Sequence, residues 1–262
     1  MEIFAFFLNN CRIILKLGLF FSILAGCTTN PANPDPLEKF NRHIFTFNEK
    51  VDKVILKPVA QTYQAVVPKP VDEGVTNFFS NINDVVVVTN DVFQFKFKQA
   101  ATDTTRLLLN STLGIFGVFD IASKVGLPKH EEDFGQTLGY WGLESGPYLM
   151  LPFFGPSSLR DLAGRGVDIL ADPRVYYADE AKLRNFFMTT DVVKIIDMRA
   201  DYLDMEQVLD TAALDRYTYI RDAYLQRRKY LVYDGNLPKE ILEEEGLFDD
   251  IKPQPKDEMK EN

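Results

Sequence analysis

The side chains best suited to acid–base or metal chemistry are few in this sequence. Only two histidines, His43 and His130, supply imidazole groups. His43 falls on the face of a predicted helix opposite its apolar residues, so we expect a solvated side chain. His130 lies in Lys129-His130-Glu131-Glu132-Asp133, which could form a metal or general-base cluster, but no second histidine or cysteine stands at ligand spacing. We therefore expect a solvated loop and no metal site there.

One serine segment is superficially similar to the nucleophile elbow of a hydrolase. Gly155-Pro156-Ser157-Ser158-Leu159 lacks the second glycine of the required Gly-x-Ser-x-Gly, and Pro156 would strain the turn. Gly164-Arg165-Gly166 is too short for a phosphate-binding loop. The sequence thus predicts no catalytic residue and no cofactor, and a membrane-associated lipid hydrolase remains the alternative function.

The remaining chemically distinctive residue is Cys27. Leu24-Ala25-Gly26-Cys27 follows basic residues and a short apolar segment, and it resembles the bacterial lipobox, in which the cysteine is acylated. We expect a lipoprotein signal peptide at residues 1–26, lipid on Cys27 and a short tether at 27–36. Thr28 stands where an aspartate would resemble the inner-membrane retention signal, which favours the periplasmic face of the outer membrane. Since Cys11 leaves with the signal, no cysteine pair is left for a disulfide.

The charge of the chain argues against a polyanionic partner. Its formal net charge is −9 at pH 7, and loss of Glu2, Arg12 and Lys16 with the leader makes it −10. The net negative charge of the protein gives no electrostatic attraction to phosphate backbones, so no nucleic-acid partner is expected. The hydrophobic fraction of 46% is enough for a folded body.

Several helices are expected to position these residues. Apolar residues spaced three and four apart from Leu37 onward predict a helix from Pro36, with Asp35 as its N-cap and Lys57-Pro58 ending or kinking it. A second helix is predicted from Val71, and the valine run 85–88 is interpreted as buried helix rather than strand. Three phenylalanines alternate with polar residues: Phe93, Phe95 and Phe97. This alternation predicts either a short edge strand or an interfacial segment.

The middle of the chain differs from its flanks. Ten of the 15 glycines fall between Gly114 and Gly166, among apolar and aromatic clusters, which predicts short helices and packed loops. Helical pattern returns over residues 180–233. An acidic, mostly disordered tail is expected at 234–262, so the folded domain is 37–233. Phe-rich amphipathic helices around an apolar, Gly-rich centre suit a surface or passage for lipid, whereas an ordinary soluble core with simply buried phenylalanines is the alternative.

Taken together, the motifs resemble those of the MlaA/VacJ family of outer-membrane lipoproteins, in unbroken order over about residues 35–230. The opening signature of that family is similar to three segments of this chain: Asp35-Pro36-Leu37-Glu38-Lys39-Phe40-Asn41-Arg42, Phe47-Asn48 and Leu56-Lys57-Pro58-Val59-Ala60. Further matching segments are Val67-Pro68-Lys69-Pro70-Val71, Asn110-Ser111-Thr112-Leu113-Gly114, Asp133-Phe134-Gly135-Gln136-Thr137-Leu138-Gly139-Tyr140-Trp141-Gly142, Gly146-Pro147-Tyr148, Arg160-Asp161 and Arg221-Asp222-Ala223-Tyr224-Leu225-Gln226-Arg227-Arg228.

The resemblance implies a mainly α-helical, ring-shaped bundle lying in the inner leaflet of the outer membrane around a central amphipathic channel. It implies removal of phospholipids mislocalised to the outer leaflet, which preserves lipid asymmetry. It also implies delivery to a soluble periplasmic carrier of an inner-membrane transporter, and a complex with a trimeric porin.

Two sets of residues are candidates for work in such a channel. The Gly-rich segment 107–127 is predicted to form a flexible gating hairpin, in which a lone carboxylate must face the channel or a basic partner. Its candidate residues are Leu107, Leu113, Gly114, Phe116, Gly117, Phe119, Asp120 and Gly126. Phe40 and Asn41 are predicted to pack the helix that seats the ring in the leaflet, with a direct channel role as the alternative.

Overall fold

The computed structural model describes residues 35–172, 174–175, 181–203, 206 and 214–239. The predicted lipidation site Cys27, the signal peptide, the tether up to residue 34 and the tail beyond residue 239 lie outside the described residues. Nothing below bears on their conformation.

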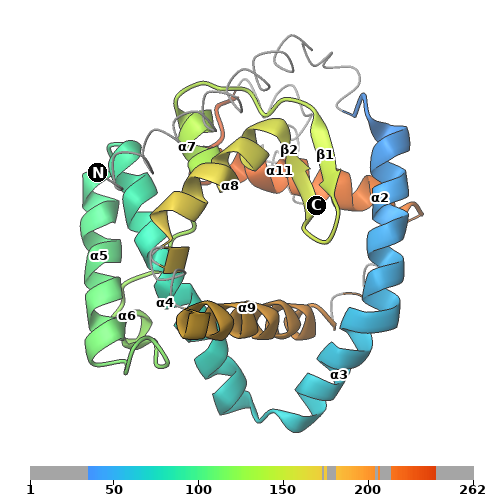
Figure 1. Cartoon of the computed structure of the whole chain (residues 1–262). Coiled ribbons are helices and arrows are strands. Elements are labelled where there is room, and N and C mark those ends of the chain that lie inside the picture. The colour runs from blue at the N-terminus through green and yellow to red at the C-terminus, as the bar shows by residue number, and fades with distance from the viewer. Residues whose placement is uncertain (1–34, 173, 176–180, 204–205, 207–213, 240–262) are drawn as a thin grey trace, which may run out of the picture.

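The described chain is mainly helical, as predicted, with one unanticipated hairpin of two antiparallel strands. The elements succeed one another around a central opening (Figure 1). They are α2 (Glu38–Val51), the π-helix η1 (Asp52–Leu56), α3 (Lys57–Val66), α4 (Lys69–Phe93), α5 (Phe97–Thr112), α6 (Ile121–Lys124), α7 (Phe134–Tyr140), β1 (Tyr148–Leu151), β2 (Gly155–Ser158), α8 (Leu159–Ala171), α9 (Ala181–Asp201) and α11 (Arg216–Val232). Within the described ranges, no helix is both long and apolar enough to cross a bilayer.

The first and last helices described, α2 and α11, meet and so close the ring. Arg42 on α2 donates to Asp215 before α11 at 2.6 Å, and its guanidinium lies 4.4 Å from the centre of the Tyr217 ring. The Tyr217 hydroxyl also donates to the buried carboxylate of Asp35. Phe45 on α2 packs edge-to-face against the same tyrosine at 5.6 Å. Contacts between residues some 180 positions apart therefore fix the circumference of the ring.

The predicted start of the first helix is wrong. The helix begins at Glu38 after Leu37, with no side-chain cap. Asp35 is not the N-cap, because its carboxylate accepts bonds from Asn41 and Tyr217 instead. The predicted kink is present, since α2 passes into α3 through the π-turn η1 just before Pro58. A π-turn inserts one extra residue and redirects the helix.

The interpretation of the valine run as buried helix is confirmed. Val86 and Val87 are buried in α4, which begins at Lys69, two residues before the predicted Val71. The edge-strand interpretation of the three alternating phenylalanines is wrong. Phe95 has a positive φ of 59° and lies in the turn that connects α4 to α5. Phe95 in this turn and Phe97, the first residue of α5, are both exposed and belong to no strand.

Short elements occupy the Gly-rich centre as predicted, except that α8 is a regular helix of 13 residues. A glycine is required at position 164 of α8 by the way this helix packs. A Cβ at this position would lie 2.3 Å from the backbone nitrogen of Gly135 on α7. The two helices cross in backbone contact, and only glycine permits that approach.

The distribution of polarity is the reverse of an ordinary soluble domain. In the described part of the chain, 19 polar or charged residues are buried against 10 hydrophobic ones. Of the described phenylalanines, only Phe79 is fully buried, and several are more than half exposed: Phe40, Phe95, Phe97, Phe116, Phe153, Phe154 and Phe186. The alternative of an ordinary core with buried phenylalanines is therefore wrong.

Candidate functional site

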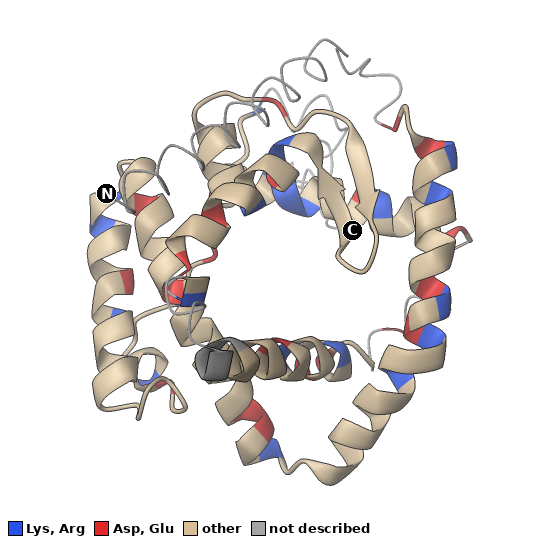
Figure 2. Ribbon diagram, viewed as in Figure 1, with Lys and Arg blue, Asp and Glu red and all other residues tan. Residues whose placement is uncertain are grey.

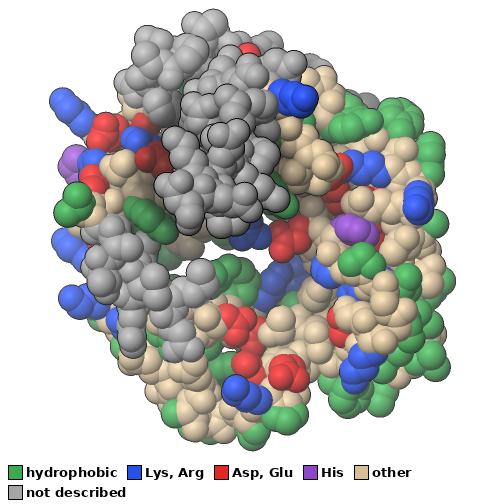
Figure 3. All heavy atoms as spheres, turned by 180° about the vertical axis from the view of Figure 1, so that it is seen from behind, with side chains coloured by type: hydrophobic (Ala, Val, Ile, Leu, Met, Phe, Trp, Pro, Cys, Tyr) green, Lys and Arg blue, Asp and Glu red, His purple; other side chains and the backbone are tan. Residues whose placement is uncertain are grey.

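A cavity of about 510 Å³, with many charged residues in its lining, lies on the inner side of the ring. Its walls come from α4, α7, α9, α11 and the loop at 128–133. The lining includes basic and acidic side chains together: Lys129, Lys194, Arg227, Arg228, Glu131, Glu132, Asp133, Asp197 and Asp201. Figure 3 shows the opening between the atoms, with charged side chains of both signs beside it and hydrophobic side chains along the outer edge. Figure 2 shows charged positions on α8 and α9, whereas α3 carries none after Lys57.

A buried arginine holds one wall of the cavity. Arg228 on α11 donates to both oxygens of Asp133 at 2.5 and 2.9 Å, and to Asp161 on α8 at 2.8 Å. Tyr224 also donates to Asp161 at 2.5 Å. Burial alone would raise the pKa of both carboxyls, but Arg228 outweighs it and holds both pKa values below their usual range. Three elements are thereby joined by one charge cluster.

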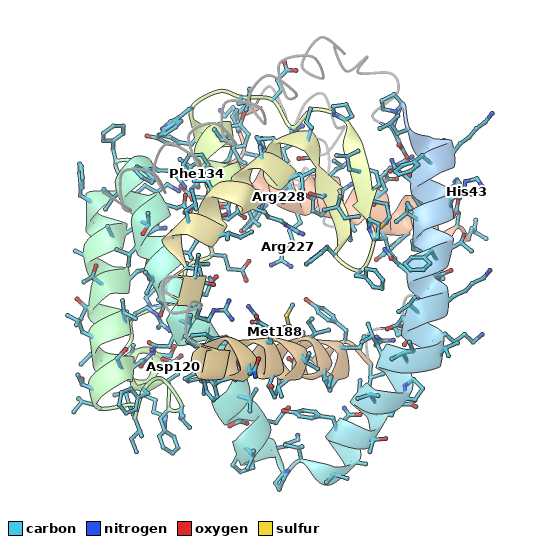
Figure 4. All side chains as sticks on the ribbon, viewed as in Figure 1. His43, Asp120, Phe134, Met188, Arg227 and Arg228 are labelled. Carbon is cyan, nitrogen blue, oxygen red and sulfur yellow. The ribbon has the colours of Figure 1, made fainter. Side chains whose placement is uncertain are left out.

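The adjacent arginine has a different environment. Arg227 points into the central opening in Figure 4, where Met188 of α9 lies across from it. It pairs with Glu131 at 2.6 Å, and both side chains are more than half exposed. Lys194 on α9 completes the basic lining, with its ammonium 5.8 Å from the Phe79 ring centre. Burial, and then the nearby Arg174, lower the pKa of Lys194.

The loop that contains His130 is not the solvated segment predicted from sequence. Glu132 is buried and accepts bonds from Gln94 and Lys96, at 2.7 and 2.8 Å. His130 lies 2.8 Å from the buried carboxylate of Asp103, and Lys129 pairs with Asp84. Each charged residue of the loop thus contacts a different part of α4, α5 or α11. No cluster in the described ranges has the composition of a metal site.

Behind this loop, Asp91 and Asp103 are both fully buried. Burial, and then the neighbouring charges of Asp103 and Glu132, raise the pKa of Asp91 to about 8. Gln99 donates to Asp91 at 2.8 Å and opposes that shift. The fold therefore favours the protonated form of Asp91.

The serines of the elbow-like segment serve the fold. Ser158 is the N-cap of α8 and accepts a bond from the Asp161 backbone at 3.1 Å. Ser157 is fully buried in β2, and its hydroxyl donates to the Ser158 carbonyl at 3.3 Å. Neither hydroxyl is presented to a substrate. His43, predicted to be solvated, is exposed on α2.

The predicted gating segment lies on the other side of α4 from the cavity. Gly117 packs against Asn81, where a Cβ would lie 2.4 Å from that side chain, and Val118 packs against Gly74. None of its candidate residues lines the 510 Å³ cavity. Leu107 is half-buried, Gly114 and Gly117 are buried, and four residues form an exposed apolar cluster: Leu113, Ile115, Phe116 and Phe119.

We expected Asp120 to face either the channel or a basic partner, and it lies beside a basic partner. The buried Arg106 lies 3.3 Å from it, and Asn110 and the Ser123 backbone donate to it at 3.0 Å each. Although burial opposes the shift, these bonds hold the pKa of Asp120 at about 2. Ile115 and Phe116 have positive φ values of 52° and 55°, followed by Gly117 at 90°. Left-handed backbone is unfavourable for Ile and Phe, so this turn is strained. Gly126 also has positive φ, with open space around it.

The two residues predicted to seat the first helix have unlike environments. Asn41 is fully buried and donates to Asp35 at 2.8 Å and to the Tyr148 carbonyl at 3.0 Å. Its side-chain oxygen accepts from the Met150 backbone at 2.9 Å. Phe40 is 57% exposed and faces away from the packed interior. Asn41 therefore joins α2 to β1, and Phe40 is available to the surroundings of the ring.

Sequence reasoning missed the Arg228 cluster. Arg228, Asp133 and Arg160-Asp161 all lie in segments that match the family motifs, but their distance apart in the sequence gave no sign that they are in contact. Asn48 was also missed. Its spacing of seven residues from Asn41 places both on one helix face, which is the signal that could have identified the pair.

Comparison with known proteins adds independent findings. The profile of the family described as MlaA lipoprotein matches residues 33–231. The Shigella flexneri and Escherichia coli K12 proteins named intermembrane phospholipid transport system lipoprotein MlaA are each 33% identical, over 90% of this chain and 95% of theirs. An uncharacterised Rickettsia felis protein is 35% identical over 74% of this chain and 76% of its own length. A solved structure, described as the structural basis for maintenance of bacterial outer membrane lipid asymmetry, matches with a TM-score of 0.67 and 35% identity, over 76% of this chain and 98% of that one.

Proposed function

The chain belongs to the MlaA lipoprotein family, and we propose that it removes mislocalised phospholipids from the outer leaflet through the opening of the ring. Its function is intermembrane phospholipid transport in the maintenance of outer-membrane lipid asymmetry. The protein associates with the outer membrane. Lipid attachment at Cys27, an orientation toward the periplasm and the route through the opening are parts of the proposal.

The observation that carries the proposed route is the inverted polarity of the ring. Charged residues of both signs surround a cavity on its inner side, whereas large hydrophobic side chains lie exposed elsewhere. Exposed apolar surface on this scale requires a membrane or a protein partner. A ring embedded in one leaflet satisfies this requirement without a membrane-spanning helix.

The cavity suits the polar end of a phospholipid. Lys194 and Arg227 supply positive charge for a phosphate, and Glu131 and Asp201 supply negative charge for an ammonium group. Arg227 and Glu131 are already paired and exposed, so a headgroup can replace either partner at small cost. The cavity therefore offers a wet path for headgroups, as the proposed function requires.

The lipid anchor and the ring are expected to act together. The eight steps along the chain from Cys27 to Asp35 can span at most about 29 Å, so the acyl chains and the ring reach the same membrane surface. We expect a Cys27→Ala variant to remain partly membrane-bound, because the ring contributes its own apolar surface. Full solubility of this variant in a membrane fractionation would contradict embedding of the ring.

The gating role of segment 107–127 remains part of the proposal, in a modified form. Because α4 separates the segment from the cavity, any gating must act by moving α4 rather than by filling the opening. The strained turn at Ile115 and Phe116 supports a second conformation of the segment. Phe40 and Asn41 are proposed to seat the ring, the first through exposed apolar surface and the second through the α2–β1 junction.

The proposed partners follow from the family resemblance. They are a trimeric porin, which would support the ring laterally, and a soluble periplasmic carrier that receives the lipid for an inner-membrane transporter. We further propose that the protein has no catalytic role, since Ser157 and Ser158 are both engaged in the fold. Release of lysolipid or free fatty acid by the purified protein would favour the hydrolase instead.

Outer-leaflet phospholipid in cells is the functional readout. Cells in which this chain is the only member of its family should show low outer-leaflet phospholipid. Cells that carry Lys194→Glu with Arg227→Glu should accumulate it, because the path then repels phosphate. Lys53→Glu on the exposed surface of η1 is the matched control. Equal asymmetry in all three strains would contradict passage through the opening.

A further inference from the structure

We propose that the turn of the β1–β2 hairpin, Pro152–Phe154, contacts the acyl chains of the transported phospholipid at the central opening, and that Asn48 is its positioning residue. The inference rests on the proposed function and assigns the apolar part of the same path. It is carried by the geometry of the hairpin and by its place in the ring.

Two asparagines on α2 hold the hairpin by the same pair of bonds. Asn41 donates to the carbonyl of Tyr148 at 3.0 Å and accepts from the backbone of Met150 at 2.9 Å. Asn48 donates to the carbonyl of Leu151 at 2.9 Å and accepts from the backbone of Phe153 at 2.9 Å. Each amide thus bridges a backbone carbonyl and the backbone N–H two residues further along the chain.

The two bonded sites follow one another along the first arm of the hairpin. Seven helical residues separate the asparagines, a rise of about 10.5 Å. The first site, at Tyr148 and Met150, lies within β1. The second site joins Leu151, the last residue of β1, to Phe153 in the turn. Side chains of α2 therefore hold both the strand and its turn.

This second site fixes an unfavourable backbone conformation. Phe153 has a φ of 65°, in the left-handed region that a bulky side chain disfavours, and Gly155 follows at 75°. The bond from the Phe153 backbone to Asn48 restrains this conformation. Strain of this kind persists where the surroundings impose it, and it is concentrated at functional sites. Here it fixes the direction in which two adjacent aromatic rings project.

Those rings are presented rather than packed away. Phe153 is 71% exposed and Phe154 is 74% exposed. The only ring contact of either is that of Phe153 with Phe47 on α2, edge-to-face at 5.2 Å, among the described residues. Figure 1 shows the hairpin turn projecting into the central opening, whereas the aromatic turn between α4 and α5 lies on the outer side of the ring.

An occupant of mixed polarity fits this arrangement. The walls of the 510 Å³ cavity on α9, α11 and the loop at 128–133 are charged, and the hairpin turn is wholly apolar. A phospholipid has a charged headgroup and apolar chains, so it can contact both surfaces at once. Bilayer acyl chains would instead be met on the outer side of the ring, where Phe95 is 69% exposed. The acyl chains that meet the hairpin turn are therefore those of the transported lipid.

Photo-crosslinking distinguishes the two sources of acyl chain. The full-length lipidated protein carries Phe154→p-benzoylphenylalanine, and a matched variant carries Phe95→p-benzoylphenylalanine. Each is irradiated in vesicles of native phospholipids, and again after purification in detergent, where only retained lipid is present. We expect position 154 to crosslink phospholipid in both settings and position 95 only in vesicles. Crosslinking of position 154 in vesicles alone would make the turn a bilayer contact and overturn the proposal.

Substitutions test the contribution of the turn and of Asn48. Phe153→Ser with Phe154→Ser should reduce retained phospholipid about tenfold without changing vesicle flotation, since two exposed phenyl groups are lost as contacts. Asn48→Ala should abolish the detergent crosslink at position 154 while leaving the melting of the far-UV circular dichroism signal cooperative. An unchanged crosslink in Asn48→Ala would remove its positioning role. If the wild-type protein retains no phospholipid at all, the proposed function fails; if it does and the double variant retains as much, only this inference fails.

Discussion

Replacement of Arg228 by alanine is the perturbation whose cost the structure defines best. The guanidinium makes three bonds of 2.5 to 2.9 Å, to Asp133 at the N-cap of α7 and to Asp161 on α8. Removal of one member of a buried charge cluster leaves its partners charged and unpaired, which costs about 3 to 5 kcal/mol. Asp161 is 5% exposed but Asp133 is 34% exposed, so water compensates part of the loss. We therefore expect about 3 kcal/mol, at the lower end of that range.

The assay is thermal unfolding of the detergent-solubilised protein, followed by far-UV circular dichroism. For a chain of this size, 3 kcal/mol lowers Tm by about 6 to 12 °C. Arg227→Ala is the matched control, because that neighbouring arginine forms an exposed pair with Glu131. Exposed pairs contribute at most about 1 kcal/mol, so the control should lose only a few degrees. Equal losses for Arg227→Ala and Arg228→Ala would refute the assignment of Arg228 as the joint between α7, α8 and α11.

The pH dependence of the Arg228→Ala effect provides a second check. Arg228 holds the pKa values of Asp133 and Asp161 below their usual range, against the effect of burial. Stability from carboxyls with lowered pKa is present above about pH 4 and is lost as the pH falls below it. The difference in Tm between wild type and Arg228→Ala should therefore shrink below about pH 4. A difference that stayed constant down to pH 3 would show that the loss comes from packing rather than charge.

Three further results are expected. Because the pKa of Asp91 is raised to about 8, the protonated form stabilises the fold and this contribution is lost as the pH rises from about 4 to 8. Urea titrations should therefore show the free energy of unfolding of Asp91→Asn gaining on the order of 3 kcal/mol on wild type between pH 5 and pH 8, and parallel profiles would count against the assignment. A disulfide between Gly74→Cys and Val118→Cys, which are in contact, should abolish lipid removal until it is reduced, and intact asymmetry in the oxidised protein would rule out gating by this segment. Asn41→Ala should raise outer-leaflet phospholipid more than Phe40→Ala, since only Asn41 is bonded to β1, and wild-type asymmetry in both would refute their seating role.

The helices were predictable because their signals are local. The apolar spacing of three and four marks α2, and the buried valine run of α4 is read correctly once its length is considered. The cap of α2 was not predictable by the same logic. Asp35 has the right type and place for an N-cap, but residues more than 100 positions away, in β1 and α11, compete for the surrounding interactions and shift the helix start to Glu38.

The site was predictable in kind but not in its residues. An amphipathic body with a lipid-handling centre follows from composition and family motifs, whereas the charged walls depend on pairs such as Arg228 with Asp133, which no spacing rule connects. His130 was judged by its polar neighbours in sequence, although its true neighbour is Asp103 on another helix. Glycines near Asp120 indicated a hinge, but only the fold places that segment on the far side of α4.

The central claim is that intact phospholipid occupies and passes the opening of the ring. Mass spectrometry of lipid that co-purifies with the full-length lipidated protein tests it most directly. We predict intact phospholipid bound to the wild-type protein, and a clear reduction when Lys194→Glu and Arg227→Glu reverse the charge of the cavity lining. Absence of phospholipid from the wild type, or an equal amount in the charge-reversed variant, would contradict the account.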